Sequence, residues 1–239
     1  MARLFASAST QNLRPSVTPP DVPFTMACWY KQTGANGCMI NIGVAGSANN
    51  AFSLQANLAT IEARTVLSAL AQSASSITPP GGVQAKWYHA VGVWASTASR
   101  QVYVDGAAGT VETTSRATSA PDSATIGSRA DATSYFNGHL FWPAIWACAL
   151  THTEILALAQ GADPRTIRPH SLWFFAELSD DTAYPNVISA RTSPYPVGPA
   201  ATMPGASRFY PPPFPAPTMA LRTNFVQALS TLFPRIIFY

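Results

Sequence analysis

Alternating apolar and polar positions run through the first 150 residues and predict β-strands rather than helices. In the clearest segment, Trp87, His89, Val91 and Val93 share one face, and Tyr88, Ala90, Gly92 and Trp94 share the other. The pattern predicts strands over 3–9, 24–30, 37–43, 51–58, 59–66, 87–95, 101–105, 124–127, 136–142, 144–150 and 171–176. Short strands in such a series, separated by turn residues, are typical of an antiparallel β-sandwich.

Two local signals add connections to this series. Asp105-Gly106 tolerates positive φ at both positions, so it predicts a two-residue hairpin turn. Thr151-His-Thr-Glu154 has the spacing of a capping box, and apolar residues follow it at near-helical intervals. Gly161 is expected to stop this helix, which gives it a length of about three turns.

The composition changes after residue 178, and we divide the chain into a sandwich domain over 1–178 and an arm over 179–239. Nine prolines lie between 194 and 217. Because proline has no N–H for a strand ladder, this stretch is expected to run extended. Residues 219–233 then follow the period of an amphipathic helix. The large apolar residues of the arm should bury against a partner and form an assembly site: Phe209, Tyr210, Phe214, Phe225, Leu229, Phe233 and Tyr239.

Charged residues make up only 10% of the chain, against about 25% in an average soluble domain. A surface so poor in charge favours association, so we expect an oligomer or an assembly with other proteins. The net charge is +3 and the basic residues are scattered, which argues against nucleic acid as a partner. No apolar stretch reaches the ~18 residues of a membrane span, and we expect neither a membrane partner nor an export signal.

Three groups of residues resemble the laminin-G / concanavalin A-like lectin family. Trp87-Tyr-His-Ala-Val91 and Gln101-Val-Tyr-Val-Asp-Gly106 are similar to its paired W-x-H-V and L-Y-V-D-G strands, with alanine in place of the usual valine. Ile126-Gly127 with Phe136-Asn-Gly138 resembles its I-G and F-x-G signature, and 144–150 leading into a capped helix resembles its final element. The resemblance implies a jelly-roll sandwich over 1–177 with one short helix after the last hairpin. In such a fold we expect Trp87 to fill the core and His89 to be packed and hydrogen-bonded.

A narrower resemblance concerns Pro164-Arg-Thr-Ile-Arg-Pro-His-Ser-Leu172. This segment is similar to the join between such a domain and a Pro-containing tail in proteins of tailed bacteriophages and prophages. The resemblance implies a virion protein, as a capsid decoration or a tail or fibre component. Its partners would be other virion proteins or sister subunits, and the arm over 179–239 would make the assembly contacts.

Catalysis is not expected from the acidic residues. Glycoside hydrolysis needs two carboxylates that flank the scissile bond, whereas Glu62 is alone on its predicted strand and the E-x-D-x-x-E arrangement is absent. Calcium would need a cluster of oxygen ligands. The loop residues Asp122 and Asp131 could contribute, but the sequence contains no tight cluster, so no cofactor is expected.

Carbohydrate binding is the alternative function. Sandwiches of this kind use exposed aromatic rings to stack on sugars. Four aromatic residues on or beside predicted strands are candidates, Trp94, Tyr103, Tyr135 and Trp142, although each could instead pack against the second sheet or a neighbouring subunit. In this alternative the chain is an adhesin module that recognises host surface glycans.

Overall fold

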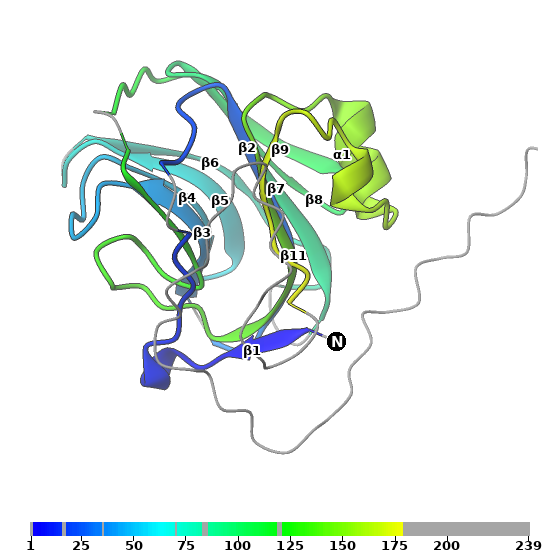
Figure 1. Ribbon diagram of the computed structural model, residues 1–239, viewed down its shortest axis with the longest axis horizontal. Helices are drawn as coiled ribbons and strands as arrows, with labels where there is room; N and C mark the ends of the chain where they lie inside the picture. Colours follow the sequence, from blue (N-terminus) through cyan, green and yellow to red (C-terminus); the bar gives the residue numbers. More distant parts are fainter. Residues whose placement is uncertain are drawn as a thin grey trace, which may run out of the picture.

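The computed structural model describes residues 2–15, 18–34, 36–69, 71–82, 86–118 and 121–178. Two antiparallel sheets pack against each other around one core, and a short helix lies near the end of the described chain (Figure 1). The all-β sandwich predicted from the sequence is confirmed. The assembly-arm residues between 209 and 239 lie outside the described residues, so the arm stays a prediction.

The first sheet has seven strands in the order β1-β11-β2-β7-β8-β9, with β12 on the same edge of β11 as β1. These strands are β1 (Arg3–Phe5), β2 (Phe24–Gln32), β7 (Tyr88–Ser96), β8 (Ser99–Val104), β9 (Ala107–Glu112), β11 (Gly138–Trp146) and β12 (Leu172–Phe175). The predicted hairpin turn between β8 and β9 is confirmed, since Asp105 and Gly106 have φ of 49° and 81°.

The second sheet has five strands in the order β10-β3-β4-β5-β6. These strands are β3 (Asn36–Gly43), β4 (Ala51–Asn57), β5 (Thr60–Val66), β6 (Gln72–Ile77) and β10 (Ser123–Ile126). The sequence pattern missed β6, because its residues are mostly serine, alanine and glutamine, which have low strand propensity.

Aromatic side chains fill the space between the sheets. Trp94 of β7 is fully buried, and its ring stacks on Phe24 with 5.0 Å between the centroids. Its indole Nε1 donates to Thr65 Oγ1 of β5 at 3.0 Å, so one side chain links the two sheets. Phe52 of β4 meets Phe24 edge-on at 5.0 Å. The alternation along β7 therefore directs Trp94 inward and His89 outward.

The expectation that Trp87 fills the core is wrong. Trp87 is half-buried and packs with Trp29 and Phe141 on the outer face of the seven-stranded sheet. His89 is 3% exposed on the same face, 5.1 Å from the Trp29 ring, and burial lowers its pKa to about 3. The histidine is packed as expected, but its Nδ1 makes no hydrogen bond with the described residues.

Four predicted elements have clearly different bounds in the structure. The strands expected over 136–142 and 144–150 are one strand, β11, with an irregularity between Phe141 and Ala144 where Trp142 adopts φ of 51° beside Pro143. The predicted strand over 3–9 ends at Phe5, and Ser7–Ser9 form a 3-10 turn. The α-helix α1 (His152–Ala159) has eight residues, about two turns.

The predicted capping box of α1 is confirmed. Thr151 Oγ1 accepts from the backbone N–H of Glu154, and Glu154 Oε2 accepts from the Thr151 N–H at 2.7 Å. The helix buries Ile155 and Leu158 against Val91 on the outer face of the seven-stranded sheet. A second 3-10 turn (Pro164–Thr166) follows, with Asp163 accepting from the Arg165 N–H at its start.

The outer face of the five-stranded sheet is polar instead. On β4, Phe52, Leu54 and Ala56 belong to the core, so the alternating positions Ser53, Gln55 and Asn57 lie on the opposite face. The cross-strand partners of Ser53 and Gln55 on β5 are Arg64 and Glu62. The outer face of the five-stranded sheet therefore presents a group of hydrogen-bonding side chains on a rigid backbone.

Candidate functional site

The structure rules out Trp94 as a glycan-binding residue in the folded protein. Its side chain has 0% exposure and lies between the two sheets, with its indole N–H bonded to Thr65. The interpretation that this ring faces outward is wrong, because the opposite face of β7 is the one directed away from the second sheet.

Tyr103 and Trp142 are half-buried on the outer face of the seven-stranded sheet. Tyr103 donates its hydroxyl to Gln101 Oε1 at 2.7 Å, and its ring lies 5.7 Å from His152. Trp142 stacks on Phe141 at 4.8 Å. Both rings thus pack within their own sheet or against α1. Of these candidates, Trp94 is the one that packs against the second sheet, as the alternative interpretation predicted.

Tyr135 lies elsewhere, in the loop between β10 and β11. It forms an isolated bridge with Cys38 of β3 and is half-buried. The four predicted aromatic residues are therefore distributed over the core, the outer face of one sheet and a loop on the other. The structure does not bring them together into one binding site.

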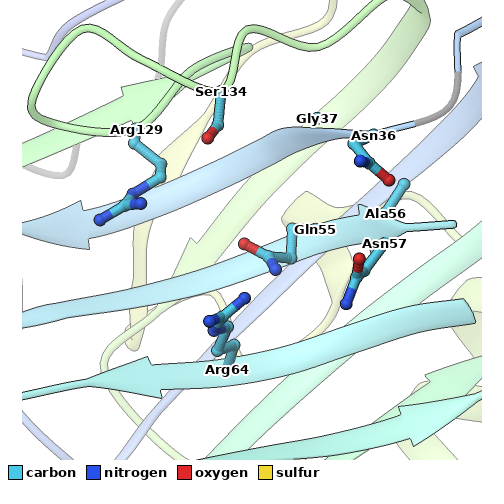
Figure 2. A pocket seen from close by; sticks show the side chains of 8 residues that line it. All are labelled: Asn36, Gly37, Gln55, Ala56, Asn57, Arg64, Arg129 and Ser134. Carbon is cyan, nitrogen blue, oxygen red and sulfur yellow. The ribbon is translucent and has the colours of Figure 1, made fainter. Parts of the chain in front are cut away.

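A pocket of about 180 Å³ opens on the outer face of the five-stranded sheet (Figure 2). Strands β3, β4 and β5 form its floor, and the loop between β10 and β11 forms one wall. Its lining is polar apart from one glycine and one alanine: Asn36, Gly37, Gln55, Ala56, Asn57, Arg64, Arg129 and Ser134. The volume is below the roughly 300–1,000 Å³ of sites for drug-sized ligands, so it suits one small polar group or sugar unit.

Gly37 allows the loop wall to approach the floor. A Cβ at this position would lie 2.6 Å from Phe136 Cα and 2.9 Å from the Tyr135 carbonyl oxygen. With glycine there, the Cys38 N–H donates to the Ser134 carbonyl at 2.8 Å. The absence of a side chain thus positions Ser134 at the rim of the pocket.

The side chain of Asn41 on β3 holds the loop segment around Ala130 against the sheet. This fully buried side chain accepts from the Ala130 N–H at 3.1 Å, and its Nδ2 donates to Ser53 Oγ at 2.8 Å. The Ala130 carbonyl in turn accepts from Arg14 Nη2 at 3.0 Å. These bonds hold the backbone beside Arg129, so the pocket wall is anchored at several points before any ligand binds.

Glu62 orients two amides of the pocket floor. Gln55 Nε2 and Asn57 Nδ2 donate to its two carboxylate oxygens at 3.1 and 2.7 Å. A carboxylate only accepts, so each amide must direct its NH₂ group toward Glu62. The carbonyl oxygens of both amides make no hydrogen bond with the described residues and remain as acceptors.

Donors complement these acceptors. Asn36 Oδ1 accepts from the Leu58 N–H at 2.6 Å, which leaves its NH₂ group as a donor. Arg64 makes no hydrogen bond or ion pair with the described residues. Arg129 bonds to the Ala48 carbonyl and lies 3.8 Å from Asp131. The pocket therefore combines acceptors and donors at close spacing, as recognition of a hydroxyl-rich ligand requires.

No residue that lines the pocket is a carboxylic acid or a histidine. Asp122 accepts from the Ala45 N–H, and Asp131 accepts from the Thr133 N–H and hydroxyl, so these two carboxylates cap separate turns. Across the described residues, no three His, Cys, Asp or Glu side chains gather as metal ligands would. The same part of the chain contains no helix that is long and apolar enough to cross a bilayer.

None of the four predicted glycan-binding residues is among the described residues that line this pocket, although the Tyr135 carbonyl lies beside Gly37. One local signal was present in the sequence, since Ser53, Gln55 and Asn57 alternate with apolar residues along β4. The remaining residues come from positions 36, 64, 129 and 134. Their proximity follows from strand order and from the path of the loop, which spacing in the sequence does not show.

Residues 6–156 match the family described as the concanavalin A-like lectin/glucanases superfamily. No protein of curated function matches the sequence. A heptameric SAP-like pentraxin from Limulus polyphemus is similar in structure, with a TM-score of 0.53 and 16% identity over 84% of this chain and 96% of the pentraxin.

A candidate carbohydrate-binding protein from Bacteroides ovatus is also similar, with a TM-score of 0.50 and 14% identity over 74% of this chain. The chain spans 50% of the length of that protein. These identities are low, so the structural similarities establish the fold alone. Because the family match extends over more than half of the sequence, the chain belongs to the concanavalin A-like lectin/glucanase superfamily.

Proposed function

We propose that this chain is a non-catalytic carbohydrate-binding module and that the pocket over β3, β4 and β5 is its sugar site. The observation that carries the proposal is the anchored set of oriented amides and guanidinium groups above a rigid sheet. Sugar hydroxyls both donate and accept, so they match carbonyl oxygens of Gln55 and Asn57 beside donors of Arg64 and Asn36. The similar protein from Bacteroides ovatus, a candidate carbohydrate binder, supports the same class of ligand.

Binding fits the pocket better than hydrolysis does. A glycosidase needs an acid and a second carboxylate on opposite sides of the scissile bond. Glu62, a carboxylate beside the pocket, is 8% exposed and accepts hydrogen bonds from two amides. A carboxylate held in this way positions its neighbours, and no second carboxylate lines the pocket.

The virion role implied by residues 164–172 remains a prediction, together with the virion location and the assembly contacts of the arm. In the structure this segment forms the short turn after α1 and the start of β12. Any sandwich with a helix at this position needs a short connection that returns the chain to the edge of the sheet. The segment therefore has this structural role whether or not the protein belongs to a virion. Carbohydrate binding and assembly into a particle are compatible, because they would use different parts of the chain.

Binding of the full chain to an array of neutral and acidic oligosaccharides tests the proposal. Calorimetry on the best binder should then show that Gln55→Ala weakens binding about tenfold or more, since it removes a hydrogen bond to the sugar and leaves one buried Glu62 oxygen without its donor. Gln72→Ala removes an exposed amide from β6 of the same sheet and serves as the matched control. A full-length, folded protein that binds no sugar on the array would overturn the proposal.

A further inference from the structure

The charge distribution around the pocket is unequal. Two arginines line it and no carboxylate does. Arg129 is held by the Ala48 carbonyl and has a long contact of 3.8 Å with Asp131. Arg64 is half-buried on β5 and has no ion pair with the described residues. One guanidinium group that lines the pocket thus makes no ion pair with a carboxylate of the described residues.

Glu62 does not neutralise Arg64 by direct contact. The two residues are two positions apart on β5 and share the outer face of the sheet. However, the Glu62 oxygens accept from Gln55 and Asn57, on the side of β4, and no Glu62–Arg64 ion pair forms. The five N–H donors of the guanidinium group of Arg64 therefore keep their capacity to bind an external acceptor.

We propose that the pocket selects acidic sugars and that Arg64 binds the sugar carboxylate. This inference rests on the proposed function and adds the class of sugar. A planar guanidinium group and a planar carboxylate form two parallel hydrogen bonds, which gives both affinity and orientation. The acceptors of Gln55 and Asn57 then bind hydroxyls of the same ring, because a carboxylate would be repelled from the side occupied by Glu62.

The position of Arg64 strengthens this selection. The residue stands on a central strand, since β5 pairs with β4 on one side and with β6 on the other. Its backbone is therefore fixed, and the cost of ordering the site is lower than for an arginine on a loop. Arg129, on the anchored loop that forms the wall of the pocket, adds a second positive charge (Figure 2).

The test compares four ligands on the full chain by calorimetry: galacturonic acid, its methyl ester, galactose and galactose 6-sulfate. The acid should bind at least about tenfold more tightly than the ester or galactose, because charge-assisted hydrogen bonds are about twice as strong as neutral ones. The preference should weaken at high salt. Equal affinity for the acid and its ester overturns the inference and leaves the proposed function intact, whereas no binding of any sugar overturns both.

Variants assign the preference to one side chain. Arg64→Gln should lower the affinity for the acid much more than the affinity for galactose, so that the preference disappears, and Arg64→Lys should restore part of it. Arg116→Gln, which removes an arginine outside the pocket, should leave the preference unchanged. Retention of the full preference in Arg64→Gln overturns the assignment. Tighter binding of the sulfate than of the carboxylate would also contradict it, since it indicates a site for tetrahedral anions.

Discussion

Substitution of Gly37 by alanine tests whether the pocket depends on close contact between the loop and β3. A Cβ would lie 2.6 Å from Phe136 Cα, 2.9 Å from the Tyr135 oxygen and 3.2 Å from Phe136 N. Ordinary contact begins near 3.5 Å for carbon atoms, so the loop backbone must move by about 1 Å. All three neighbouring atoms belong to the main chain and have no rotamer by which to avoid the new methyl group.

The expected cost has two parts. Overpacking of this kind costs about 1–3 kcal/mol. Moving the loop also weakens the 2.8 Å bond from the Cys38 N–H to the Ser134 carbonyl, and one hydrogen bond contributes about 0.5–1.5 kcal/mol. The lower entropy of the unfolded alanine chain offsets about 0.4–1 kcal/mol. We therefore expect Gly37→Ala to lower the free energy of unfolding by about 2 kcal/mol.

Urea denaturation measures the stability, and sugar binding measures the pocket in the same sample. Sugar affinity should fall because Ser134 and the adjoining wall move away from the floor. Gly46→Ala is the control: its Cβ has no atom within 4 Å, but its φ of 71° is unfavourable for alanine. This control should cost about 1 kcal/mol through the backbone and leave sugar binding unchanged. A Gly37→Ala protein with wild-type stability and affinity would refute the reasoning.

Three further predictions concern stability. Trp94→Ala should cost about 3–5 kcal/mol in urea denaturation, because it leaves a cavity in the core, and a loss of sugar binding without loss of stability would contradict this. Thr151→Ala should cost about 1 kcal/mol by removing the cap of α1, whereas the exposed control Thr113→Ala should cost little. His89 has a pKa of about 3 when folded against about 6.5 unfolded, so the unfolded chain binds its proton first as the pH falls. The contribution of His89 to stability is then complete above pH ~6.5 and decreases toward pH ~3. Denaturation at pH 7 and pH 5 should show a smaller loss for His89→Gln than for the wild type.

Local patterns in the sequence predicted the elements that depend on neighbouring residues. The turn at Asp105-Gly106 and the cap at Thr151 depend on φ preferences and on bonds between residues three positions apart, so spacing is sufficient to find them. Strand β6 was missed because its polar composition lacks a strand signal, and it is held in the sheet by pairing with β5.

Strand β7 shows the limit of alternation. A period of two separates Trp94 from His89, but it does not say which face meets the second sheet. Both faces of β7 are apolar, because α1 covers Val91 on the outer side. The sequence therefore favoured Trp87 as the core residue and left Trp94 as a candidate ligand site. The structure instead buries Trp94 in the core and places Trp87 half-buried on the outer face of the sheet.

Short-range patterns in the sequence were sufficient to predict the all-β class, most strands, the capped helix and the family resemblance. The position of a ligand site, in contrast, depends on how distant segments pack. The pocket joins Asn36, Gln55 and Arg64 with Arg129 and Ser134, which are brought together by pairing of β3, β4 and β5 and by a loop that approaches over Gly37. Contacts between residues so far apart in the sequence depend on the order of the strands in the sheet and on the space available to the loop backbone above Gly37. Neither property produces a periodic pattern of residues in the sequence.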